Sequence, residues 1–173
     1  MTLTVADYDA AENEAIHRLP NRIIEAAQPE TFLRRGYPTR AATDTEIRRF
    51  IDSMHELGEQ SDYRDALSGA TDDEYALIER ITRSVADVSR RLYGRSIIPR
   101  GALIRALLAY RHIRAIIEPS AETVFEIGAG SGYLGALLGL SGYRFAATEI
   151  TQGFYMAQSQ LWESLFGDRF IEL

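Results

Sequence analysis

The 173-residue sequence contains no cysteine and no lysine. All 19 of its basic residues are arginine. The absence of cysteine excludes disulfides, thiolate metal sites and a cysteine nucleophile. The absence of lysine excludes a Schiff-base nucleophile and the lysine of a phosphate-binding loop. No apolar run approaches the ~20 residues that span a bilayer, and residues 1–9 lack the basic and apolar regions of a secretory signal. We therefore expect a cytoplasmic protein with no membrane partner.

The chain has fewer basic than acidic residues, 19 against 25, which gives a formal net charge of −6. An acidic chain is repelled by a phosphate backbone, so we expect no nucleic-acid partner. Histidine is scarce: His17, His55 and His112 stand alone in helical stretches, without a second ligand one turn away. This spacing predicts no metal site. What remains is an ordinary globular composition, 46% hydrophobic, at a length of roughly one domain.

The first 120 residues carry apolar residues at the spacing of amphipathic helices, which predicts a helical N-terminal domain over residues 1–120. Capping boxes formed by Thr43 with Glu46 and by Thr71 with Glu74 mark two helix starts. The expected helices cover Asp9–Leu19, Arg22–Ala27, 43–58, 71–94 and the segment after Pro99 as far as Pro119, with a loop over Phe32–Ala42. One apolar face comprises Tyr75, Ile78, Ile81, Val85, Val88 and Leu92, and it favours contacts between helices over a cofactor site.

From residue 121 onwards strands and helices alternate. The expected elements are a strand at Thr123–Ile127, a helix at Ser131–Leu140, a strand at Tyr143–Thr148, a helix at Gln152–Phe166 and the start of a third strand at Phe170–Leu173. The side chains of Thr123, Phe125 and Ile127 favour a strand that is buried. This order is typical of a parallel sheet built from βαβ units, so residues 121–173 are predicted to form an α/β domain.

A glycine-rich loop connects the first expected strand to its helix, in the run Glu126-Ile127-Gly128-Ala129-Gly130-Ser131-Gly132. Glycines there let the backbone approach a ligand closely, beside the free N–H groups of a helix start. Glu149 follows Gly128 by 21 residues, at the expected end of the next strand. A carboxylate at that position can accept hydrogen bonds from both hydroxyls of a ribose. The combination predicts half of a nucleoside-binding site.

Two ligands compete for this site. Counted from Gly130, the loop fits G-x-G-x-x-G and indicates a dinucleotide. Counted from Gly128, it is G-x-G-x-G preceded two residues earlier by Glu126. A carboxylate at the end of a buried strand repels a diphosphate and attracts an ammonium or sulfonium cation. Glu126 therefore favours S-adenosylmethionine over NAD(P) or a flavin.

The run from Val124 to Gly132 resembles motif I of the class I, Rossmann-like S-adenosylmethionine-dependent methyltransferases. Glu149 resembles the acid that closes the second strand in that family. The resemblance implies an incomplete Rossmann-like parallel sheet of two to three strands behind a helical cap. The phrase GAGSGYLGALL is also similar to bacterial members, including sugar and secondary-metabolite O-methyltransferases. The resemblance thus implies S-adenosylmethionine as cofactor and a small-molecule acceptor.

Transferred position by position, the resemblance assigns the methionine side of the cofactor to Glu126, Gly128, Ala129, Gly130, Gly132 and Tyr133, the ribose to Glu149 and the adenine to Ile150. Gln152 and Tyr155 open the next helix and could face the same pocket. Less specific interpretations stay open: the glycines form only a tight turn, Glu149 is a solvated strand end, and Tyr133 merely covers the helix start. His112 suits a general base, although a surface histidine is the more ordinary interpretation.

The motif content changes the interpretation of the length. Residues 123–173 hold one βαβ unit of ~30 residues and the beginning of another, whereas the fold implied by the resemblance has six or seven strands. We therefore expect the N-terminal part, or a truncated form, of a larger methyltransferase, or else self-association through the helical region or the open sheet edge. The alternative functions are a non-catalytic nucleoside-binding or interaction module and an oxidoreductase fragment.

Overall fold

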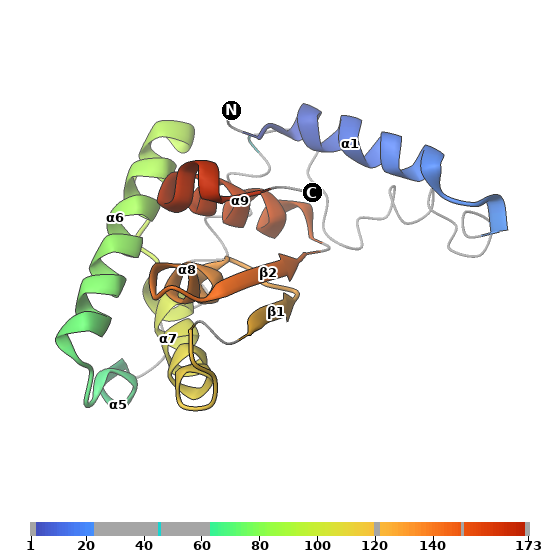
Figure 1. The fold of residues 1–173 in the computed structure, drawn as a ribbon. Coiled ribbons are helices and arrows are strands. Elements are labelled where there is room, and N and C mark those ends of the chain that lie inside the picture. Colours follow the sequence, from blue (N-terminus) through green and yellow to red (C-terminus); the bar gives the residue numbers. More distant parts are fainter. Residues whose placement is uncertain (1–2, 23–44, 46–62, 120–121, 150, 172–173) are drawn as a thin grey trace.

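The computed structural model describes residues 3–22, 45, 63–119, 122–149 and 151–171. In these ranges the protein is mostly helical, with one two-stranded parallel sheet (Figure 1). The elements are α1 (Val5–Arg18), α5 (Tyr63–Leu67), α6 (Asp72–Tyr93), α7 (Arg100–Arg114), β1 (Thr123–Ile127), α8 (Tyr133–Leu140), β2 (Arg144–Thr148), α9 (Gln152–Phe166) and the short 3₁₀ helix η1 (Gly167–Arg169). No helix among the described residues is long and apolar enough to cross a membrane.

Local sequence signals set the ends of α6. The Thr71 hydroxyl accepts a hydrogen bond from the Glu74 amide at 3.3 Å, and the Glu74 carboxylate accepts one from the Thr71 amide at 3.1 Å. Gly94 ends the helix in the left-handed conformation, at φ +75°. The predicted start and end of this helix are therefore confirmed. Helix α1 begins earlier than predicted because Thr4 and Asp7 form a second reciprocal cap.

Strands β1 and β2 pair in parallel, with Glu126 opposite Ala147 and Ile127 opposite Thr148, and α8 connects them. The predicted strand–helix–strand–helix order is confirmed. The third strand predicted at Phe170–Leu173 is wrong within the described residues: Gly167 begins a 3₁₀ turn, and Phe170 packs edge-on against Trp162 at 5.9 Å between ring centroids. Phe170 packs on the helical core, and neither Phe170 nor Ile171 pairs with the sheet.

Only one face of the sheet is covered by described elements. Phe125 and Ile127 are 58% and 82% exposed, whereas Val124, Phe145 and Ala147 pack against the helical core. The prediction that Thr123, Phe125 and Ile127 form a buried strand is therefore wrong. The cause is tertiary, because in the described part of the chain helices pack on the face that carries Val124 and Glu126.

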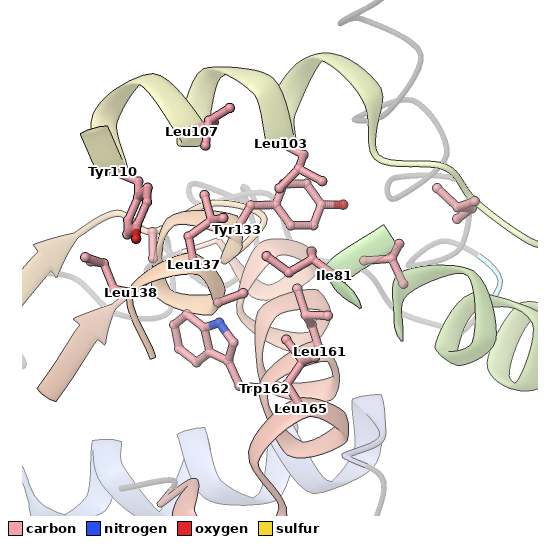
Figure 2. Packing of buried hydrophobic residues seen from close by; sticks show 14 of the residues in the cluster. Ile81, Leu103, Leu107, Tyr110, Tyr133, Leu137, Leu138, Leu161, Trp162 and Leu165 are labelled. Carbon is pink, nitrogen blue, oxygen red and sulfur yellow. The ribbon is translucent and has the colours of Figure 1, made fainter. Parts of the chain in front are cut away.

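The hydrophobic core lies between α6, α7, α8 and α9 (Figure 2). Ile81, Leu107 and Leu137 are completely buried, and α7 lies directly against α8. The buried cluster runs continuously across the predicted domain boundary at residue 120. One residue of the predicted apolar face of α6 is an exception: Tyr75 is 50% exposed, because Glu74 takes the inward position in that turn.

Two glycines bring α8 close to its neighbours. A Cβ atom at Gly135 would lie 2.4 Å from the Phe145 ring and 2.6 Å from Trp162, and one at Gly139 would lie 2.6 Å from Phe166. Larger side chains would push α8 away from β2 and α9. These glycines therefore allow α8 to pack closely along its length, directly after the glycine-rich loop.

Several predicted elements lie largely or wholly outside the described residues. They are the helix at Arg22–Ala27, of which only Arg22 is described, the loop at Phe32–Ala42 and the helix over 43–58. These elements stay predictions.

Candidate ligand site at the glycine-rich loop

The loop between β1 and α8 contains three left-handed glycines in alternation. Gly128, Gly130 and Gly132 have φ angles of +75°, +57° and +74°. Residues with a Cβ are strained in this conformation, so the loop needs glycine at all three positions. A Cβ at Gly128 or Gly130 would meet no atom within 4 Å, whereas one at Gly132 would lie 2.6 Å from the Cβ of Gln158. The first two glycines thus face open space, and the third packs against α9.

The loop is fixed on its inner side by hydrogen bonds. The amides of Gly128 and Ala129 both donate to the Thr148 carbonyl, at 2.8 and 3.3 Å, which extends the sheet ladder into the loop. The Gly132 carbonyl accepts from the indole Nε1 of Trp162 at 2.8 Å. Trp162 is the single tryptophan of the chain, so its fluorescence reports directly on this loop.

Glu149 lies against the loop, as the sequence predicts. Its Oε2 accepts a hydrogen bond from the Gly130 amide at 2.7 Å, and its Oε1 accepts one from the Thr151 amide at 2.8 Å. The carboxylate therefore bridges the glycine loop and the start of α9. An acid that holds two backbone N–H groups is better fixed than the solvated strand end considered above, because charge-assisted hydrogen bonds are short and strong.

Glu126 brings a second carboxyl group to the same end of the sheet. It points to the covered face of β1, and its Oε2 is buried with no hydrogen-bond partner among the described residues. Burial raises the pKa of Glu126, and the negative charge of Glu149 raises it further. A buried acceptor without a partner is costly, and a cation placed beside it would relieve that cost.

Tyr133 lies in the core rather than on the open side of the loop. Its ring packs near Leu103 and Leu137 (Figure 2), and burial raises the pKa of its hydroxyl. It also borders a small cavity of about 30 Å³ between α6 and α9, together with Ser131 and Gln160. This position favours the interpretation in which Tyr133 covers the helix start, and its contact with the methionine side of a cofactor stays a prediction.

The remaining predicted residues do not join the site in the described structure. Ile150 lies outside the described residues. His112 is exposed in the last turn of α7, a helix that packs on α8. Its role as a base stays a prediction.

Residues far away in the sequence approach the site from α1. The side chain of Gln152 is only 1% exposed, and its Nε2 lies 3.5 Å from Oδ1 of Asp9. Tyr155 makes an edge-on contact with Tyr8, with 5.6 Å between ring centroids. The sequence indicated Gln152 and Tyr155 as possible pocket residues, but it carried no signal for their partners on α1.

Comparison with known proteins found no matching family model, no similar curated protein and no similar solved structure.

Proposed function

We propose that this chain binds S-adenosylmethionine through a Rossmann-like half-site and belongs to a methyltransferase acting on a small molecule. One observation carries the proposal: Gly130, in a loop of left-handed glycines, donates its amide to Glu149 at the end of the neighbouring parallel strand. Loop and acid thus meet at the carboxyl ends of two parallel strands, where open α/β sheets bind their ligands.

The two carboxyl groups would have different tasks. Glu149 lies beside open space at Gly128 and Gly130, and its two oxygens suit the two hydroxyls of a ribose. Glu126 offers a buried, unpartnered oxygen that suits a cationic group of the ligand. When bound, S-adenosylmethionine supplies a methyl group on a positively charged sulfur, and orienting that group toward an acceptor provides much of the catalysis.

A dinucleotide is less well supported. The amide that would hold a diphosphate, that of Gly130, already donates to a carboxylate, and a second carboxyl group lies close by. One feature does suit the dinucleotide pattern, because Gly135 allows close packing of α8 on Phe145. The close packing at Gly135 does not discriminate between ligands. The two carboxyl groups do, because they would repel a diphosphate bound beside them.

Titration of the purified chain with S-adenosylhomocysteine and with NAD tests the proposal. Calorimetry measures the heat of binding. Trp162 emission gives a second signal, since the indole is hydrogen-bonded to the loop. We expect saturable binding of S-adenosylhomocysteine and none of NAD. If the folded chain does not bind S-adenosylhomocysteine at millimolar concentration, the proposal is wrong. Methyl transfer to a small-molecule acceptor then separates an enzyme from a non-catalytic nucleoside-binding module.

The variant Glu126→Gln is expected to stabilise the free chain and to weaken the binding of S-adenosylmethionine. Removing a buried charge without a partner should raise the free energy of unfolding at neutral pH by about 1 kcal/mol. Losing the charge opposite the sulfonium should reduce affinity by roughly tenfold. Thermal unfolding and calorimetry measure the two effects, and Glu122→Gln, an exposed acid just before β1, is the matched control.

The sign of the pH dependence follows from the raised pKa of Glu126. Below the ordinary pKa of a glutamate, Glu126 is protonated in the folded and the unfolded chain and does not lower the free energy of unfolding. As the pH rises toward the raised pKa of the folded chain, the unfolded chain ionises first and the free energy of unfolding falls. Above the raised pKa it falls no further. Over the interval between the two pKa values the affinity for a cationic ligand should increase. Parallel pH profiles for the native chain and Glu126→Gln would argue against this role.

A further inference from the structure

Most residues of helix α1 are exposed in the described part of the chain. Of its 14 residues only Val5 is buried. Its ends are stabilised within the helix, by the cap of Thr4 on Asp7 and by an exposed ion pair between Arg18 and Glu14. An isolated helix of this length is marginally stable in water, so its position depends on the elements that it touches. In Figure 1 its C-terminal half projects beyond the other described elements.

Among the described residues, α1 and the chain just before it make three contacts with α9. They are the ring contact of Tyr8 with Tyr155, the approach of Asp9 to Gln152 at 3.5 Å, and the Leu3 carbonyl just before α1, which accepts from Gln160 at 3.4 Å. The less exposed residues of α1 form one stripe at helical spacing: Val5, Tyr8, Asp9, Glu12 and Ile16. Because this stripe contains two acids, it is more polar than the faces that form the core.

The start of α9, which α1 approaches, lies directly after the candidate ligand acid. Glu149 accepts from the Thr151 amide, and the next residue, Gln152, approaches Asp9. The carboxyl ends of β1 and β2 point to the side of the molecule where α1 lies (Figure 1). The ligand acid Glu149 and the contact of Gln152 with α1 are thus separated by a single backbone turn.

We propose that α1 is a strap whose docking on α9 is coupled to nucleoside binding at Glu149, with Gln152 as the positioning residue between them. The inference rests on the proposed function, because it needs a ligand at Glu149. A bound ribose fixes the turn from Glu149 to Gln152, and the fixed turn holds Asp9 and Tyr8 more firmly. By reciprocity, the docked strap strengthens ligand binding by the same factor that the ligand strengthens docking.

Hydrogen exchange of the α1 amides, with and without S-adenosylhomocysteine, tests the coupling. We expect the ligand to slow exchange over residues 5–18. Asp9→Ala should weaken binding by roughly two- to tenfold, the size of one hydrogen bond, and should remove the slowing of exchange. Asp9→Asn keeps an acceptor oxygen and should restore both. Asn13→Ala changes only an exposed side chain of α1 and serves as the control.

Each outcome separates the strap from the proposed function. If S-adenosylhomocysteine binds but α1 exchanges equally fast with and without it, the strap is wrong and the proposed function stands. If the unaltered chain binds no S-adenosylhomocysteine, both are wrong. Tyr8→Leu removes the ring contact with Tyr155 and gives a second test should Asp9→Ala unfold α1. Equal affinity in Tyr8→Leu, Asp9→Ala and the native chain would also overturn the coupling.

Discussion

Replacing Glu149 by alanine should lower the affinity for S-adenosylhomocysteine by about a hundredfold or more. Two hydrogen bonds from ribose hydroxyls to a carboxylate contribute about 3 kcal/mol together, and each 1.4 kcal/mol corresponds to a factor of ten. The loop would also suffer, because the Gly130 and Thr151 amides lose the acceptor that both now use. Calorimetric titration of the variant against the native chain measures the effect.

Controls separate lost contacts from lost structure. Glu149→Gln keeps one acceptor oxygen and should bind with intermediate affinity, whereas Glu122→Ala removes an exposed acid nearby and should bind normally. Trp162 emission in the free variants shows whether the loop is retained, because the indole donates to Gly132. Undiminished binding by Glu149→Ala would show that the ribose is held elsewhere.

Replacing Arg111 by methionine should lower the free energy of unfolding by about 3 kcal/mol. Arg111 holds Glu74 with two hydrogen bonds, Nε to Oε1 at 3.0 Å and Nη2 to Oε2 at 2.8 Å, and its Nη1 donates to the Ala66 carbonyl at 2.8 Å. Because the Glu74 side chain is only 1% exposed, the variant would leave a buried carboxylate without its main partner. Chemical denaturation monitored by circular dichroism measures the loss.

Two further variants test whether the buried charge is the cause. In Glu74→Leu/Arg111→Met both charges are removed, and the loss should be smaller than in Arg111→Met, since no ion stays unpaired. Arg114→Met removes a more exposed arginine that lies 3.5 Å from Glu74, and it should cost less than about 1 kcal/mol. Equal losses in Arg111→Met and Arg114→Met would contradict this account.

The same pair predicts how stability depends on pH. The hydrogen bonds from Arg111 hold the pKa of Glu74 below its ordinary value of 4.5. Stabilisation by the ionised carboxylate is therefore complete above pH 4.5 and is lost as the pH falls through the lowered pKa of the folded chain. Glu74→Gln should lack this acid-sensitive part of the stability. An unchanged acid limb in Glu74→Gln would show that other carboxylates cause it.

The helix ends and the glycine loop could be predicted from sequence because both are local. A capping box closes within four residues, and a left-handed turn depends on glycine at that position. Thr71, Gly94 and the run from Gly128 to Gly132 therefore act as predicted. Glu149 could be placed beside the loop because the pairing of adjacent parallel strands brings their carboxyl ends together.

The predictions that failed concern which side of an element is covered. Phe125 and Ile127 suggested a buried strand, yet the described helices pack on the opposite face of β1. Phe170 suggested a strand, yet it packs against Trp162. In each case the local pattern allowed both outcomes, and the choice depended on neighbours that are distant in the chain.

The helix caps and the glycine loop could be read from the amino-acid sequence because each depends on residues within a few positions of each other. The order of strands and helices and the place of the following acid could be read because each element has its own periodic pattern and adjacent parallel strands pair. Packing between distant elements decided that α1 approaches Gln152 of α9 and that Arg111 pairs with Glu74, 37 residues away. Such contacts form where packing brings surfaces together, and no spacing along the chain records them. Glu126 combines both kinds of information. Its place at the end of β1 could be predicted from the motif, whereas the burial of its Oε2 without a hydrogen-bond partner among the described residues depends on packing.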